Sequence, residues 1–114
     1  MSTAGAARLL AVGATWRLTG AAPAGRALVG GLVGGDESER AVAGIALTKA
    51  GDRSVPLLAA ALTASADPRP VVDVLASIGT PAARSALRRA VEAGSPAADP
   101  AAEALRTLDD ADGL

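Results

Sequence analysis

Apolar residues recur along this chain at the three- and four-residue spacing of one helix face. The spacing is clearest in three stretches, which contain Val71, Val74, Leu75 and Ile78; Ala83, Ala86, Leu87, Ala90 and Val91; and Ala101, Ala104, Leu105 and Leu108. Residues three and four apart lie on the same side of an α-helix, so each set predicts an amphipathic helix. Alternation with a period of two, as in a half-buried strand, is not sustained along the sequence. The pattern therefore predicts an all-α protein.

Residues with cap chemistry mark where the helices begin and end. Asp67, Thr80 and Asp99 each precede a proline, which places a side-chain acceptor at the N-cap and proline at the first helical position. Asp36 with Glu39 fits a capping box. The glycines that follow an apolar stripe, where a left-handed residue ends a helix, are Gly20, Gly51 and Gly79. The predicted helices cover residues 5–18, 22–33, 37–49, 53–63, 68–78, 81–92 and 99–109.

A helix-turn-helix unit repeats along the chain. Aligning Gly20, Gly51 and Gly79 gives units of 31 and 28 residues. The second helix of each unit carries a pair of large apolar residues, namely Leu28 and Leu32, Leu58 and Leu62, and Leu87 and Val91. A hairpin of this size cannot bury its apolar faces alone, so neighbouring units must stack. The sequence predicts a short α-solenoid of stacked antiparallel helical hairpins, with about three and a half repeats.

A family resemblance rests on two stretches of this repeat. Its residues are Ala46, Leu47, Gly51, Asp52, Val55, Pro56, Leu58, Ala61 and Leu62, followed by Asp67, Pro68, Val71, Val74, Leu75, Ile78 and Gly79. They resemble the short HEAT-like repeats of the phycobilisome-lyase type. The resemblance implies a divergent N-terminal hairpin over residues 1–35, HEAT-like repeats over 36–110 and a short acidic tail over 111–114. It implies no catalytic motif, because such modules occur in adaptors, enzyme subunits and nucleic-acid binders.

Composition removes most catalytic chemistry. The 114 residues, enough for one domain, include no Cys, His, Tyr or Phe, which excludes disulfides, thiolate and imidazole metal sites, and Ser-His or Cys-His nucleophile pairs. We expect a protein that is not an enzyme and needs no metal or cofactor. The net charge of -1, from 11 basic and 12 acidic residues, disfavours nucleic acid and anionic membranes as partners.

Targeting signals are weak. The apolar run from Leu9 to Trp16 is too short to span a bilayer. Residues 1–35 contain three arginines and no acid, which is the charge bias of a transit peptide, but they contain few serines. Rare lysine beside abundant Ala, Gly and Arg is typical of a bacterial gene of high GC content. We expect a cytoplasmic bacterial protein.

Arginines on the second helices are the first candidates for a binding face. The predicted helix over 81–92 carries three of them, Arg84, Arg88 and Arg89, and Arg26 and Arg53 are further candidates. Second helices usually line the ligand-facing side of a repeat solenoid, so these side chains would bind an acidic segment or phosphates of a partner. The alternative is an ordinary solvated helix face.

Apolar residues near the N-terminus are the second set of candidates. Matching the leucine pairs makes Val29 equivalent to Arg88, with Val33 one turn later, so both valines would form an exposed docking patch. The alternative is a shift of register by one residue, which makes both valines core. Trp16, the single aromatic residue, is a candidate anchor for a partner, although a lone Trp in a small helical domain is more often core.

These observations favour a non-enzymatic protein-interaction module, an adaptor or a small subunit of a larger assembly. Its partner would be another protein, one with an acidic segment, bound on the second-helix face. Two alternatives stay open: a nucleic-acid-binding HEAT-like protein, and a non-catalytic or lyase-like enzyme subunit. Partner identity and oligomeric state do not follow from the sequence.

Overall fold

The helices predicted from the apolar pattern are all present. The computed structural model describes residues 2–20, 22–64, 67–94 and 96–112, and within these ranges all regular structure is helical. Its elements are α1 (Ser2–Thr19), α2 (Ala22–Gly34), α3 (Glu37–Ala50), the 3₁₀-helix η1 (Gly51–Ser54), α4 (Val55–Ala64), α5 (Arg69–Ile78), α6 (Pro81–Ala93) and α7 (Ala98–Asp112). The all-α prediction is confirmed. The two last residues of the predicted tail, 113–114, lie outside the described ranges.

Two of the predicted helix caps are confirmed by their hydrogen bonds. At the start of α3, the Glu39 amide donates to Asp36 Oδ1 over 2.9 Å, and the Asp36 amide donates to Glu39 Oε1 over 3.3 Å, which completes a capping box. At the start of α6, the Ala83 amide donates to Thr80 Oγ1 over 3.3 Å, and Pro81 is the first helical residue. These side chains satisfy amides that have no partner within the helix.

Two other predicted caps are wrong. Helix α5 begins at Arg69, one residue later than expected, so Pro68 occupies the N-cap and no side chain caps the helix. Asp67 Oδ1 instead accepts a hydrogen bond from the Arg69 amide over 3.3 Å. Helix α7 begins one residue earlier than expected, so Asp99 lies in its first turn. A carboxylate there still interacts favourably with the positive end of the helix dipole.

The glycine at the end of α3 differs from the others. Gly79, after α5, has φ 65° and ψ 7°, the left-handed conformation expected of a helix-ending glycine. Gly51, after α3, has φ 63° but ψ -133°, a conformation that a residue with a Cβ rarely adopts. The chain then forms η1 before α4 begins, so the second helix of this unit starts at Val55 rather than at residue 53.

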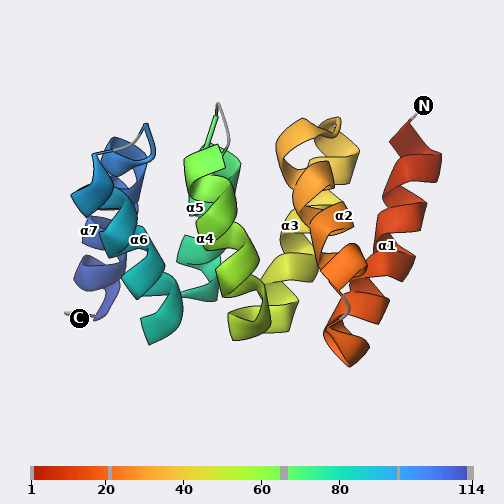
Figure 1. Cartoon of the computed structure of the whole chain (residues 1–114), viewed down its shortest axis with the longest axis horizontal. Coiled ribbons are helices and arrows are strands. Elements are labelled where there is room, and N and C mark those ends of the chain that lie inside the picture. The colour runs from red at the N-terminus through yellow and green to blue at the C-terminus, as the bar shows by residue number, and fades with distance from the viewer. Residues whose placement is uncertain (1, 21, 65–66, 95, 113–114) are drawn as a thin grey trace.

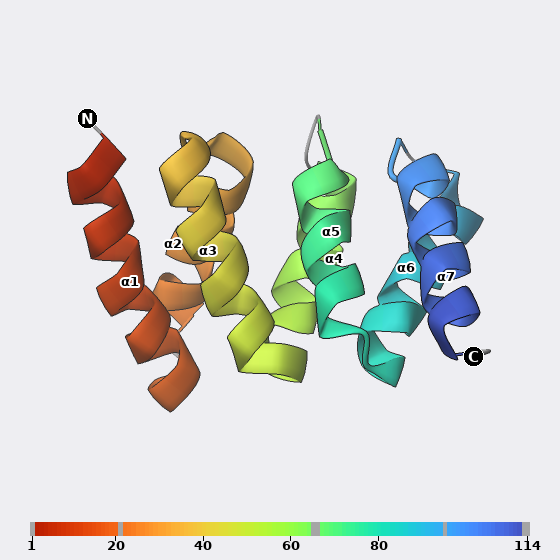
Figure 2. The same ribbon diagram turned by 180° about the vertical axis from the view of Figure 1, so that it is seen from behind.

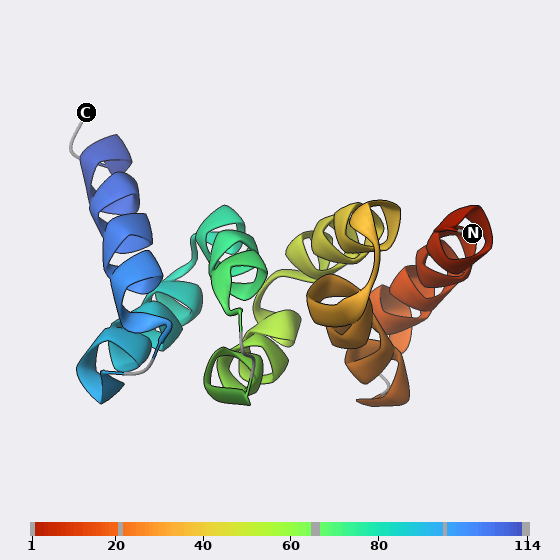
Figure 3. The same cartoon turned by 90° about the horizontal axis from the view of Figure 1, so that it is seen from above.

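The helices form two layers that run side by side along the longest axis of the molecule. Helices α2, α4 and α6 form one layer (Figure 1), and α1, α3, α5 and α7 form the other (Figure 2). A view from above shows both rows (Figure 3). The overall extents are 39 × 27 × 24 Å, and the radius of gyration is 13.5 Å. That radius is close to the value of about 13 Å expected for a compact domain of this size, because the array is short.

A line of leucines between the layers forms the core. The fully buried leucines come from α2 to α6 in turn, and are Leu28, Leu47, Leu58, Leu75 and Leu87. The predicted second-helix pairs are buried with one exception: Val91 is 36% exposed, so its assignment to the core is wrong. Val91 lies two turns after Arg84 on the same side of α6, at the margin of the buried face rather than at its centre.

Glycines let the N-terminal helices approach closely. A Cβ at Gly13 of α1 would lie 2.8 Å from the Cβ of Ala46 on α3, closer than side-chain carbons come to one another. A Cβ at Gly31 of α2 would lie 2.7 Å from Leu9 Cδ1 of α1. Gly13 and Gly31 therefore serve as contact points between helices, whereas a Cβ at Gly30 or Gly34 would meet no atom within 4 Å.

Candidate partner-binding groove

The structure places the three arginines of α6, which were predicted to act together, in two different environments. Arg84 is half-buried: its Nε donates to the Gly79 carbonyl over 3.0 Å, and its Nη1 lies 3.9 Å from Asp109 Oδ1 on α7. Arg88 and Arg89 are exposed. Arg84 and Arg89 lie about 140° apart around the helix, because each residue turns the helix by about 100°. Arg84 therefore links α6 to α7, and only Arg88 and Arg89 remain as surface cations.

Trp16 and Arg53, two more candidate partner-binding residues, serve contacts within the molecule. Trp16 is 4% exposed, and its Nε1 donates to Ser54 Oγ over 3.0 Å. Ser54 Oγ in turn donates to the Leu47 carbonyl over 2.9 Å. Arg53 Nη1 donates to the carbonyls of Trp16 and Arg17 at the end of α1, both over 3.2 Å. Trp16 is a core residue because it lies on the face of α1 that packs against α3 and η1, so its indole is not available to a partner.

The remaining candidates, Arg26, Val29 and Val33, lie together in one groove between α2 and α4. This α2–α4 groove has a volume of about 710 Å³. Its other lining residues are Gly30, Leu57, Ala60, Ala61, Ala64 and Asp67. Val29 is half-buried and packs on the core, whereas Val33 is exposed. Each of the two predictions for the valines is therefore right for one residue. Val29 contacts the core, and Val33, one turn later on α2, lies on the surface.

Small side chains form much of the lining of the α2–α4 groove. Gly30 lies between the two valines, and a Cβ placed on it would meet no atom within 4 Å. On the opposite wall, α4 contributes alanines and the half-buried Leu57. The lining is therefore mostly apolar, a surface type that binds apolar side chains of a partner.

Two opposite charges lie on the rim of the α2–α4 groove. Arg26 comes from α2, and Asp67 comes from the segment that leads into α5, and both are exposed. Within the described part of the chain neither side chain forms an ion pair. The rim can therefore supply a guanidinium donor and a carboxylate acceptor to a ligand without first breaking an internal ion pair.

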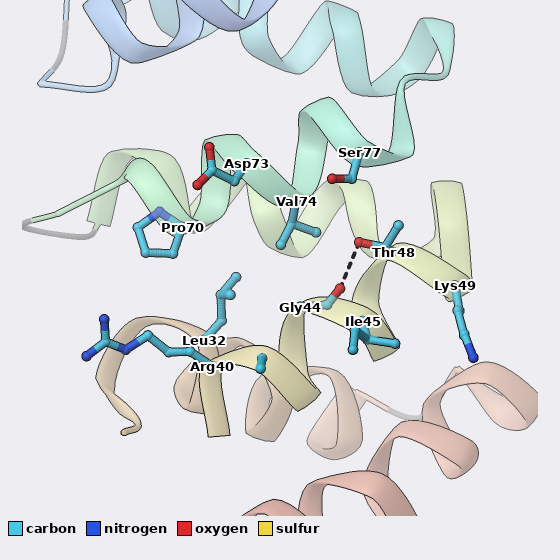
Figure 4. A pocket seen from close by; sticks show the side chains of 11 residues that line it. Leu32, Arg40, Gly44, Ile45, Thr48, Lys49, Pro70, Asp73, Val74 and Ser77 are labelled. Atoms are coloured by element: carbon cyan, nitrogen blue, oxygen red, sulfur yellow. Dashed lines mark hydrogen bonds between the residues drawn. The ribbon is translucent and has the colours of Figure 1, made fainter. Parts of the chain in front are cut away.

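A second groove, on the other layer, was not predicted from the sequence. It lies between α3 and α5, has a volume of about 580 Å³ and includes Ile45, which is 58% exposed (Figure 4). Arg40 and Lys49 lie on its α3 side and Asp73 on its α5 side. Ile45 is the large apolar residue on the outer side of α3, and that was the available signal.

The polar groups of this α3–α5 groove are partly used within the molecule. Thr48 Oγ1 donates to the Gly44 carbonyl over 2.7 Å, as drawn in Figure 4. Arg40 Nε donates to the Gly35 carbonyl over 3.0 Å. The α2–α4 groove is the stronger candidate because three of the residues singled out from the sequence line it, whereas none of them lines the α3–α5 groove.

A third groove, between α5 and α7, has a volume of about 770 Å³ and a more polar lining. Asp73, Asp99 and Glu103 contribute carboxylates, and Arg69 contributes a guanidinium. Within the described ranges no group of three or more Asp, Glu, His or Cys side chains is arranged to hold a metal ion. These acids are exposed, so they form a solvated surface.

Two further features of the described residues bear on function. Every buried side-chain nitrogen or oxygen atom among them has a hydrogen-bond partner. No helix in the described ranges is long and apolar enough to cross a membrane.

Comparisons of the chain with models of known protein families, with curated proteins and with solved structures give no match. The resemblance to HEAT-like repeats therefore stays a prediction from the residues named above. What the structure defines is an all-helical, two-layer domain with an apolar groove on each layer.

Proposed function

We propose that this protein is a non-enzymatic protein-interaction module, an adaptor or a small subunit of a larger assembly. It binds a segment of its partner in the α2–α4 groove, on the layer formed by the second helices. The observation that carries this proposal is the grouping of Arg26, Val29 and Val33 around one apolar hollow. Apolar clefts with a few placed polar groups are the usual binding sites of proteins.

The groove favours a partner segment with apolar anchors and at least one acidic residue. Val33 and Leu57 would contact the anchors, and Arg26 would bind the carboxylate. Arg88 and Arg89 are exposed on α6, in the same layer as the groove. A longer acidic segment would thus continue from the groove toward α6.

The proposal includes a short HEAT-like α-solenoid as the architecture. Its support is the alternation of helices between two layers and the buried leucine that each second helix contributes, Leu28, Leu58 and Leu87. Composition supports a cytoplasmic location in a bacterium. A role for a nucleic-acid partner is disfavoured by the net charge of -1 and by the internal use of Arg53 and Arg84.

The test is a groove-filling substitution with a matched control. Gly30→Leu puts a side chain into the α2–α4 groove, whereas Gly34→Leu places the same side chain on the same helix outside it. A Cβ at either glycine meets no atom within 4 Å, so both variants are expected to fold. The intact protein and both variants are used as bait in nuclease-treated extracts of source cells.

We expect a protein that is retained in stoichiometric amount by the intact chain and by Gly34→Leu and is lost from Gly30→Leu. Arg26→Glu should weaken its retention, most of all at low salt. Equal retention by all variants would place binding elsewhere on the molecule. Material that is retained only when nuclease is omitted would instead support the nucleic-acid alternative.

A further inference from the structure

The outer face of α1 is apolar although none of the other described helices covers it. Leu10 is 63% exposed and Leu18 is 82% exposed, the two most exposed large apolar residues described. Ala7, Ala11 and Ala14 lie exposed on the same helix. The opposite face of α1, which includes Leu9 and Trp16, packs on the core. A terminal helix that ends an array normally has a polar outer face, because it has no further neighbour.

The spacing of the outer residues suits packing against another helix. Residues 7, 11, 14 and 18 alternate steps of four and three, the spacing of the seam positions in a two-helix coiled coil. Alanine at three of these positions lets a second helix approach closely, and Leu18 supplies a large side chain at the fourth. Leu10 lies beside the seam.

The charges that flank this seam have one sign. Arg8 lies on one side of the seam and Arg17 on the other, at positions where helix pairs form interhelical ion pairs. Both side chains are exposed, and among the described residues neither forms an ion pair. The complementary surface is therefore a helix with an apolar stripe and acidic flanks.

We propose that α1 docks a single amphipathic α-helix of a partner protein, with Asp or Glu on both sides of its apolar stripe. This docking surface is separate from the α2–α4 groove, and the partner helix would extend the layer of α1, α3, α5 and α7 by one element. The stripe consists of Ala7, Leu10, Ala11, Ala14 and Leu18.

A second copy of this chain fits the surface less well. In an antiparallel pair of α1 helices, Arg8 of both copies lies along one edge of the seam and Arg17 of both copies along the other, so four cations would flank the interface without an acid. The exposed face of α7 is acidic, but both of its leucines are half-buried, so it offers no apolar stripe to α1.

An anionic membrane surface also fits less well. Interfacial helices insert bulky apolar residues, often Trp or Phe, from a face flanked by several cations. Here the aromatic residue of α1, Trp16, points into the core, and the outer face is mostly alanine with two arginines.

The experiment uses two labelled synthetic peptides of about three heptads, with Leu at the seam positions. One peptide has Glu at all flanking positions and the other has Lys. Fluorescence anisotropy measures the Kd of each peptide for the full chain. We expect the Glu peptide to bind at least about tenfold more tightly than the Lys peptide at low salt.

Variants of the full chain locate the site. Leu18→Ser should weaken Glu-peptide binding by about tenfold or more, whereas Val91→Ser, a matched change at an exposed valine on α6, should leave the Kd unchanged. The double variant Arg8→Glu, Arg17→Glu should reverse the preference, so that the Lys peptide binds more tightly. Circular dichroism confirms that each variant is folded.

Three results would overturn the proposal. The first is equal affinity for both peptides, or no binding by either. The second is a dimer in sedimentation equilibrium that Leu18→Ser abolishes, which would assign the surface to a second copy. The third is co-sedimentation with vesicles of phosphatidylserine and phosphatidylcholine without peptide selectivity, which would assign it to a membrane.

Discussion

The two end helices of the array, α1 and α7, expose different kinds of side chain to solvent. Helix α7 exposes charged residues, among them Asp99, Glu103, Arg106 and Asp110, and buries Ala101. Helix α1 exposes leucine and alanine, as described above, and flanks them with arginine alone. Each end helix packs mainly against two other α-helices, so position in the array does not explain the difference. The outer face of α7 is therefore polar, as is usual for a protein surface, whereas the outer face of α1 is apolar, as is usual for a helix that packs against a neighbour.

The two ends also differ in how their helices are joined. At the N-terminal end, glycine contacts and the buried Trp16–Ser54 hydrogen bond hold α1 against α3 and η1. At the C-terminal end, Leu75 and Leu87 fill the space between helices, and the Arg84–Asp109 pair lies near the surface. The N-terminal contacts depend on specific atoms, and the C-terminal contacts depend on buried volume. Substitutions at the two ends should therefore lower the stability of the protein for different reasons.

The largest effect is expected from Leu87→Ala. Leu87 is fully buried, and removing a buried leucine side chain costs about 2–5 kcal/mol of unfolding free energy. One continuous core joins both ends, so Trp16 fluorescence and helical circular dichroism should report the same urea midpoint. Val91→Ala on the same helix should cost less than about 1 kcal/mol, because Val91 is partly exposed. An unchanged midpoint for Trp16 fluorescence in Leu87→Ala would mean that the two ends unfold independently.

Ser54→Ala is expected to have the next largest effect. The substitution removes the acceptor of the Trp16 Nε1 hydrogen bond and the donor to the Leu47 carbonyl, and both partners are buried. Leaving buried polar groups unpaired costs about 1–3 kcal/mol. Thr63→Ala removes an exposed hydroxyl that donates to the Ala60 carbonyl and should change stability by less than about 0.5 kcal/mol. Equal stability of the two variants in urea titrations would contradict this account of the N-terminal end.

Two glycine substitutions should have opposite signs. Gly13→Ala places a Cβ 2.8 Å from the Cβ of Ala46, and overpacking of this kind outweighs the gain in helix propensity, for a net loss of about 1 kcal/mol. Gly30→Ala meets no atom within 4 Å, so it should stabilise the chain by about 0.5–1 kcal/mol. Thermal unfolding followed by circular dichroism measures both. A stabilised Gly13→Ala variant would show that α1 and α3 do not need glycine to approach.

The smallest effect is expected at the Arg84–Asp109 pair. The two atoms are 3.9 Å apart and Asp109 is exposed, so their coupling should be below about 0.5 kcal/mol. A double-mutant cycle with Arg84→Ala and Asp109→Ala isolates that coupling from the other contacts of Arg84. The coupling should vanish at high salt. A coupling that is large and independent of salt would mean that the C-terminal end also depends on specific polar contacts.

Local features of the fold followed from the sequence because they depend on neighbouring residues. The capping box of Asp36 and Glu39 and the cap at Thr80 involve residues three apart, so spacing alone predicts them. The glycine after α5 followed in the same way. Asp67 did not occupy the N-cap of α5: Pro68 takes that position, and the Asp67 side chain accepts a hydrogen bond from the Arg69 amide. Helix ends therefore depended on details that spacing does not resolve.

The features that were missed depend on residues far apart in the chain. The partner of Trp16 is Ser54, and nothing near either residue in sequence indicates the other. Val91 repeats the position of a buried leucine, yet the packing of α6 leaves it at the margin of the core. Of the candidate site residues, Arg26, Val29 and Val33 proved to share one groove, whereas Arg84, Arg53 and Trp16 serve internal contacts. Residue type selected all six as candidates, but only the packing determines which of them line the groove and which make internal contacts.

The Trp16–Ser54 hydrogen bond also has a consequence for the order of folding. It joins residues 38 positions apart, whereas the caps of α3 and α6 join residues three positions apart. Closing the longer loop costs more chain entropy, so local helical hairpins, the α1–α2 pair among them, can form before Trp16 meets Ser54. We therefore expect helical dichroism to develop first during refolding and Trp16 fluorescence to reach its native value last. On a ribosome, α1 would emerge before Ser54, and its tryptophan could be buried in the native way only after Ser54 had followed.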